Sequence, residues 1–120
     1  MQYLCLIYSA EAEIAGFTPE QQGTLMKDYM AFTQAIMASG HYKGGNPLQP
    51  SVTATSVRVR DGKTMTTDGP FAETREQLAG YYLIEAANLD DALGVAVRIP
   101  TVKFGTIEVR PIQSYPMPQA

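Results

Sequence analysis

The residue types best suited to proton transfer or ligand binding gather around the segment Thr67-Asp68-Gly69-Pro70-Phe71. Asp68 offers a carboxylate at the start of an Asp-Gly-Pro turn, where it could act as a general base or accept a hydrogen bond from a ligand. A structural role is equally open, because an aspartate in this position can also cap the turn that follows it. We treat Asp68 as the first candidate catalytic residue.

His41 is the single histidine of the chain, and histidine is the side chain that ordinarily titrates near neutral pH. It is therefore the second candidate catalytic residue. It directly follows Gly40, at the expected end of a helix, where the helix dipole favours a protonated imidazole without any substrate. A catalytic and a structural role are both compatible with this position.

Charged side chains supply two further candidate ligand contacts. Arg75 and Glu76 could hold an anion and move a proton, or they could form a solvated charge pair of little energetic value. Arg110 lies beside Glu108 on an apolar strand, where it could bind a substrate or form an ion pair across a contact between two copies.

Tyr82 completes the candidate ligand-binding set. Together with Tyr81 it is expected in the core, with the phenol hydroxyl reaching the edge of a cavity. We expect a small pocket between sheet and helices, or at a seam between two copies, near Asp68 and the loop after it.

Several kinds of chemistry are excluded by counting. One cysteine and one histidine cannot supply a zinc site, and no HExxH or EF-hand spacing is present, so we expect neither a metal nor a cofactor. The glycine-rich segment 40–45 matches no nucleotide-binding motif. Cys5 lies within an apolar strand and is expected to be a buried, inert thiol. The net charge of −3 and a pI of about 5.0 argue against a nucleic-acid partner.

The length of 120 residues fits one domain, which we place at residues 1–113, followed by an extended tail at 114–120. The longest early apolar run, Leu4 to Tyr8, is far shorter than the roughly 20 residues of a membrane helix, so no membrane partner is expected. The N-terminus lacks the features of a signal peptide. We therefore expect a cytoplasmic protein.

The elements that must position these residues follow from the pattern of apolar side chains and turn signals. Residues 3–8 predict a strand that is apolar on both faces, which requires cover on both sides. Thr18 to Gln21 predict a capped helix start, and an apolar stripe at three- and four-residue spacing continues it from Pro19 to Ser39, with Gly40 ending it. The segment Gly44 to Pro47 is expected to be a connection.

A hairpin with strands over Val52 to Arg60 and Lys63 to Asp68 is predicted next, because Asp61-Gly62 is the strongest short turn signal between two strands. Counting outward across the turn pairs Arg60 with Lys63 and Thr55 with Asp68, which places Asp68 on the face of Val57 and Val59. The remaining predicted elements are a strand over 79–86, a helix that Asn88 caps and that stops before Pro100, and a strand over 106–112.

This order predicts a ferredoxin-like α+β sandwich with an extra hairpin strand and two helices on one face of an antiparallel sheet. Two helices can cover only one face of the sheet. Because the first strand is apolar on both faces, the second face is expected to be covered by another copy in a symmetric homodimer.

The segment 67–71, continued through 72–82 and joined by Ile107-Glu108-Val109-Arg110-Pro111, resembles the DGPF branch of the YCII-related family; Gly45, Leu48 and Pro50 extend the likeness. The resemblance implies the dimeric α/β-barrel fold. Some members are associated with alternative sigma factors, so it also implies a sigma-factor link. The better-described YCII branch uses a His on the first helix with an Asp late in the chain. No His lies between Pro19 and Ser39, so that pair is not carried over.

Three functional readings follow. The first is a YCII-related small-molecule-binding protein, with acid/base chemistry on a small organic acid or lactone as its enzymatic form. The second is a non-catalytic ligand-binding or regulatory module associated with a sigma factor. The third is a structural dimer without a ligand. Whether the protein is an enzyme is left open by the sequence.

Overall fold

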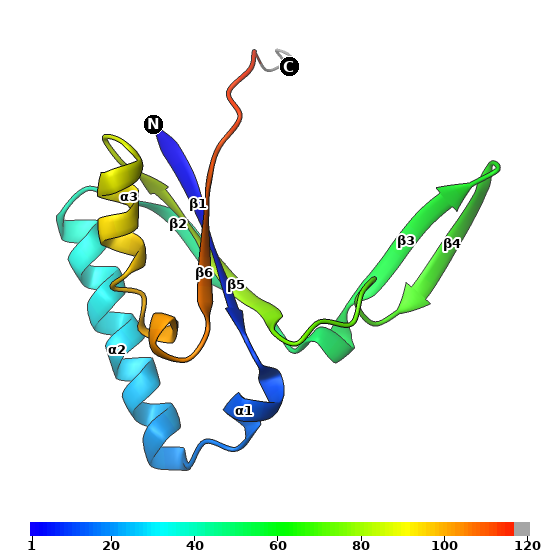
Figure 1. Cartoon of the computed structure of the whole chain (residues 1–120), viewed down its shortest axis with the longest axis horizontal. Coiled ribbons are helices and arrows are strands. Elements are labelled where there is room, and N and C mark those ends of the chain that lie inside the picture. The colour runs from blue at the N-terminus through cyan, green and yellow to red at the C-terminus, as the bar shows by residue number, and fades with distance from the viewer. Residues whose placement is uncertain (117–120) are drawn as a thin grey trace.

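The structure is a computed structural model that describes residues 1–116, so the end of the expected tail, 117–120, lies outside the described residues. It is a mixed α+β fold in which a four-stranded antiparallel sheet carries the helices α2 (Pro19–Ala38) and α3 (Leu89–Ala96) on one face (Figure 1). The strand order is β2-β5-β1-β6. These elements are β1 (Gln2–Ser9), α1 (Glu11–Ala15), α2 (Pro19–Ala38), β2 (Tyr42–Pro47), β5 (Gln77–Glu85), α3 (Leu89–Ala96) and β6 (Thr106–Pro111).

Helix α2 forms where the sequence predicts it and ends one residue earlier. The Thr18 hydroxyl accepts a hydrogen bond from the Gln21 amide, and the Gln21 side chain accepts one from the Thr18 amide, so the capping box is complete. Gly40 follows the helix with a φ of 82°, a conformation that favours glycine. The capping prediction is confirmed at both ends.

The core lies between the sheet and the helices. Tyr3, Cys5 and Ile7 point from β1 toward the helices and are buried, together with Ile36 of α2 and Ile84 of β5. Burial raises the pKa of the Cys5 thiol to about 11, which keeps it protonated and unreactive at neutral pH. The expected inert cysteine is therefore confirmed.

One expectation about the sheet is wrong. Residues 44–47 belong to edge strand β2, which pairs with β5, and do not form a connection. A Cβ on Gly45 would lie 2.8 Å from the Tyr81 carbonyl oxygen, so glycine allows the two backbones to approach closely. Pro47 is tolerated because it lies at the end of an edge strand. The glycine and proline residues that predict a connection at 44–47 are therefore compatible with an edge strand.

The hairpin has the predicted register from Thr55–Asp68 to Arg60–Lys63, in strands β3 (Thr55–Arg60) and β4 (Lys63–Asp68). Asp61 and Gly62 adopt φ of 53° and 73°, as a tight I′ turn requires. The hairpin is not an extra strand of the main sheet, however, but a separate two-stranded sheet. Its first strand also starts later than expected, because residues Ser51–Thr53 form the 3₁₀ turn η1.

Two helical features were not predicted correctly. Helix α1 has only five residues and no side-chain cap, so it leaves no start signal in the sequence. In α2, three residues of the expected apolar stripe are exposed: Met26, Met30 and Met37 are 63%, 58% and 58% exposed. The buried residues of the helix are Ile36, which belongs to that stripe, and Phe32, which does not.

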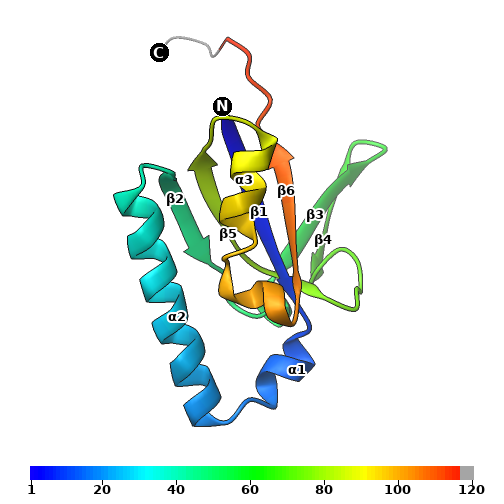
Figure 2. The same ribbon diagram turned by 60° about the vertical axis from the view of Figure 1, so that its left-hand side comes forward.

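The second face of the sheet carries no helix, and the sheet of this chain is open and does not close into a barrel (Figures 1 and 2). The register places Leu4, Leu6, Tyr81 and Leu83 together on this face. We call the surface formed by these four residues the open sheet face. Its apolar composition agrees with the prediction of two apolar faces on β1.

Two glycines in different surroundings predict opposite effects of an added methyl group. A Cβ on Gly105 would lie 2.2 Å from the Tyr8 carbonyl oxygen, whereas a Cβ on Gly94, inside α3, meets nothing within 4 Å. Gly105→Ala should lower the free energy of unfolding by about 1–3 kcal/mol through overpacking. Gly94→Ala should raise it by up to about 1 kcal/mol through helix propensity. Urea unfolding of both variants checks this, and equal effects of the two substitutions would contradict it.

Candidate functional site

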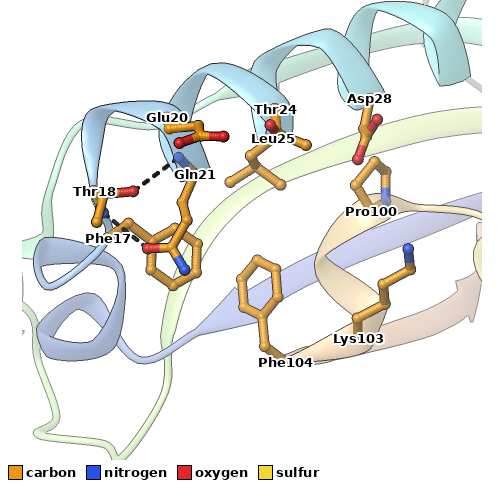
Figure 3. Close-up of a pocket in the computed structure, with 10 residues that line it drawn as sticks. All are labelled: Phe17, Thr18, Glu20, Gln21, Thr24, Leu25, Asp28, Pro100, Lys103 and Phe104. Atoms are coloured by element: carbon orange, nitrogen blue, oxygen red, sulfur yellow. Dashed lines mark hydrogen bonds between the residues drawn. The ribbon is translucent and has the colours of Figure 1, made fainter.

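A cavity of about 510 Å³ opens between the start of α2 and the 3₁₀ turn η2 (Pro100–Lys103) (Figure 3). Its volume lies in the range of small-molecule sites. The walls come from two segments that are far apart in the sequence. They are Phe17, Thr18, Glu20, Gln21, Thr24, Leu25 and Asp28 on one side, and Pro100, Lys103 and Phe104 on the other.

Local structure fixes both walls of this cavity. Phe17 and Phe104 meet edge to face, with ring centroids 5.3 Å apart, and form its apolar end (Figure 3). The buried Thr101 hydroxyl lies 2.5 Å from the Tyr29 hydroxyl, which ties η2 to α2. This hydrogen bond lies on the core side of the cavity and holds the η2 wall against α2.

Charged groups lie at the other end of the cavity. Lys103 carries an ammonium group that forms no ion pair within residues 1–116, and Asp28 lies across from it on α2 (Figure 3). Glu20 adds a second carboxylate at the start of α2, on the Phe17 side of the cavity (Figure 3). An apolar end joined to an unpaired cation suits an organic anion with an apolar body.

His41 lies elsewhere, between the end of α2 and the start of α3. Its Nε2 is 3.1 Å and 3.2 Å from the two carboxylate oxygens of Asp91, and its Nδ1 is 2.6 Å from the Ser39 hydroxyl oxygen. The Ser39 oxygen is also 3.2 Å from the Ile36 carbonyl oxygen. A serine, an imidazole and a carboxylate thus stand in one hydrogen-bonded row.

Both protonation states of His41 find partners in this row. In the neutral imidazole, Nε2–H donates to Asp91 and Nδ1 accepts from the Ser39 hydroxyl. In the imidazolium, Nδ1–H donates to Ser39, which then donates to the Ile36 carbonyl. The row does not line the cavity of Figure 3, so its direct effect is to join the ends of two helices.

Asp91 was missed as a functional candidate, although the sequence contains its signal. The Asn88 side chain accepts from the Asp91 amide at 2.9 Å, and the Asp91 carboxylate accepts from the Ala87 amide at 2.9 Å. From the sequence, the pattern Asn88-Leu89-Asp90-Asp91 predicts only a helix cap. The hydrogen bond from Ala87, followed by the contact with His41, lowers the pKa of the Asp91 carboxyl below its ordinary value.

Asp68 ends β4 and is exposed, and no hydrogen bond to its carboxylate is found within residues 1–116. The turn after it is held by other groups: the Gly69 amide donates to the Ala54 carbonyl at 2.6 Å, and the Ser56 hydroxyl donates to the Gly69 carbonyl at 3.0 Å. The partly apolar surroundings expected for Asp68 are absent, because Val57 and Val59 beside it are themselves exposed.

The other sequence candidates lie on separate elements. Arg75 and Glu76 lie in the loop before β5, Tyr82 faces the helices, and Arg110 lies exposed on β6. The Tyr82 hydroxyl is 2.7 Å from the Thr33 hydroxyl, and burial raises the pKa of this tyrosine. The structure brings none of these candidates to the cavity of Figure 3, nor Asp68 and His41 to each other.

No group of three or more histidine, cysteine, aspartate or glutamate side chains suited to a metal ion occurs within residues 1–116. The predicted absence of a metal stays a prediction. In the same part of the chain, every helix is too short or too polar to cross a membrane.

The pKa of Asp91 predicts how stability depends on pH. A carboxyl whose pKa is lower in the folded chain stabilises the fold above its unfolded pKa, and this contribution is lost as pH falls through the folded pKa. The loss should therefore begin near the ordinary value of 3.8 and continue below it. We expect Asp91→Asn to be less stable than the wild type at neutral pH and the two to converge in acid. Urea unfolding of both proteins across the acid range checks this, and a stability difference that stays constant with pH would contradict it.

The sequence also matches known proteins along nearly its whole length. The YCII-related domain covers residues 1–116. The chain is 36% identical over 117 residues to an uncharacterised protein of Rhizobium meliloti (strain 1021), an alignment that spans 96% of this chain and 94% of that protein. The family-level prediction is confirmed, and the relative adds no activity to it. On this evidence the chain belongs to the family of YCII-related domain proteins.

Proposed function

We propose that this protein binds a small organic acid with an apolar body in the cavity between α2 and η2. The observation that carries the proposal is that the Phe17–Phe104 end and the Lys103 ammonium, which forms no ion pair within residues 1–116, share one cavity of about 510 Å³. The aromatic rings would remove the apolar part of the ligand from water. Lys103 would pair with its carboxylate, which distinguishes an acid from a neutral compound of the same shape.

The enzymatic form of this proposal is acid/base chemistry on the bound acid or on a lactone. Such a step needs a group that can take up a proton beside the ligand. Asp28 and Glu20 are the carboxylates that line the cavity, so they take the place that the sequence assigned to Asp68 and His41. We also assign the chain to the DGPF branch of its family, on the segment 67–71.

We further propose a homodimer in which two open sheet faces meet and close a barrel. The apolar side chains Leu4, Leu6 and Leu83 on this face support the proposal, because an uncovered apolar sheet face is a common interaction surface. Glu108 and Arg110 border it on β6 and form no ion pair within residues 1–116. A two-fold axis can place Glu108 of one copy opposite Arg110 of the other, and Arg110 of the first copy opposite Glu108 of the second. The two charges are therefore self-complementary.

The ligand proposal predicts preferential binding of aryl carboxylates. Phenylacetate should shift the NMR signals of Phe17 and Phe104 and bind more tightly than 2-phenylethanol, which lacks the charge. Lys103→Met should raise the dissociation constant of phenylacetate by about twofold to fivefold, the size of a solvent-accessible charge pair. Lys27→Met, an exposed lysine of α2 that does not line the cavity, is the control.

The same titration tests the site expected from the sequence. Asp68→Asn and His41→Gln should bind phenylacetate as the wild type does, because neither residue lines the cavity. If either variant abolishes binding while Lys103→Met does not, the ligand site lies near Asp68 or His41 and the cavity proposal is wrong.

The dimer proposal predicts a light-scattering mass of twice the 13.1 kDa chain. Arg110→Glu should raise the dimer dissociation constant about tenfold, because it leaves only carboxylates along the edge of the interface. The double variant Glu108→Arg/Arg110→Glu reverses the order of the charges and should restore the affinity. A single-chain mass for the wild type at every concentration would refute the dimer.

A further inference from the structure

The hairpin of residues 55–68, which we call the arm, is not covered by any other part of the described chain. It extends away from the body (Figures 1 and 2), and nearly all of its residues are exposed, with Val57 at 63% and Val59 at 59%. A two-stranded hairpin alone is at best marginally stable in water. The arm therefore requires a surface to pack against.

The two faces of the arm differ in chemistry. The register places Val57 opposite Thr66 and Val59 opposite Thr64, so one face is β-branched and carries charge only at its base, at Asp68. The other face carries the three basic side chains Arg58, Arg60 and Lys63. Such alternation is typical of a strand pair with one face in water and one face packed on protein.

Hydrogen bonds at the base of the arm fix its direction. The Glu11 amide donates to the Gln77 side-chain oxygen at 2.9 Å, and the Glu11 carboxylate accepts from the Ser51 amide at 3.0 Å and 3.2 Å. The Gln77 side chain also donates to the Thr74 carbonyl at 2.6 Å. Helix α1, turn η1 and the loop before β5 are thus clamped together, and the arm is held away from the sheet of its own chain.

The arm extends on the side of the sheet that faces away from the helices (Figure 1). The sheet and the arm diverge from the base of the arm toward its tip. A body that packs on the open sheet face therefore lies between the sheet and the arm. We propose that this body is a second copy of the chain and that each copy packs the Val57–Val59 face of its arm against the other. This inference rests on the dimer proposed above and adds the arm to its interface.

The area of the interface supports a second copy with its arm. The four strands of the sheet are six to nine residues long and present about 470 Å² of sheet face, little more than half of the roughly 800 Å² that each partner buries in a standard stable interface. The face of the arm and the surface that receives the other arm add about 200 Å² each, which brings the area above about 800 Å² per copy. Each arm would also carry Asp68 to the second copy, so a residue expected in the site from the sequence would lie at the seam.

The test replaces the two valines by an isosteric polar residue that keeps the hairpin. Val57→Thr/Val59→Thr retains β-branched side chains, so the arm should fold, but the added hydroxyl groups would be buried in the interface. We expect the dimer dissociation constant from sedimentation velocity to rise at least tenfold. Arg58→Thr/Met65→Thr changes a matched pair on the other face and should leave it within about twofold.

A labelling experiment identifies what the arm touches. In the Thr66→Cys variant, a thiol-reactive spin label attaches only to the arm, because Cys5 is fully buried. When the spin-labelled variant is mixed with isotope-labelled wild-type chains, the label should broaden amide signals of the isotope-labelled copy. The arm would have no role in the interface if the protein is a dimer, no such broadening is seen and the two double variants change the dimer dissociation constant equally. The sheet dimer would remain in that case. A monomeric wild type would instead overturn the dimer and the arm contact together.

Discussion

The structure depends on a strand that is apolar on both faces and can bury only one of them within its own chain. On one side, Tyr3, Cys5 and Ile7 of β1 are covered by α2 and α3 and form the core. On the other side, Leu4 and Leu6 join side chains of β5 on a face without helices. Exposed apolar area of this kind favours association, since each Å² removed from water contributes about 25 cal/mol. Within the described residues 1–116, the open sheet face, the unpaired Glu108 and Arg110 of β6 and the uncovered arm occur on this one side, and the proposed second copy would account for all three.

The sequence predicted the elements whose signals are local. The capping box at Thr18, the cap at Asn88 and the I′ turn at Asp61-Gly62 each depend on residues a few positions apart, and the structure has all three. It did not predict β2, because a glycine that admits a neighbouring backbone is identical in sequence to one that breaks a strand. The place of the hairpin was also wrong: its register follows from its own turn, whereas its separation from the sheet depends on which strand β5 pairs with.

The candidate site was less predictable than the fold, because it depends on contacts between segments that are distant in the sequence. A cavity forms where distant segments meet, and Phe17 and Phe104 are brought together only by the packing of η2 on α2. No spacing rule in the sequence relates them. The partner of His41 was also distant, although Asp91 stood in a capping pattern that the sequence displayed. Asp68, selected for its motif, instead lies at the base of the arm, where its function would depend on the second copy.

The central claim is that the open sheet face meets its own copy, and intermolecular NOEs test it most directly. In a sample that mixes isotope-labelled and unlabelled chains, the methyl groups of Leu4, Leu6 and Leu83 in the labelled copy should show NOEs to protons of the unlabelled copy. These three residues share the face that no helix covers. A dimer whose intermolecular NOEs arise only from other surfaces, such as the exposed methionines of α2, would contradict the account.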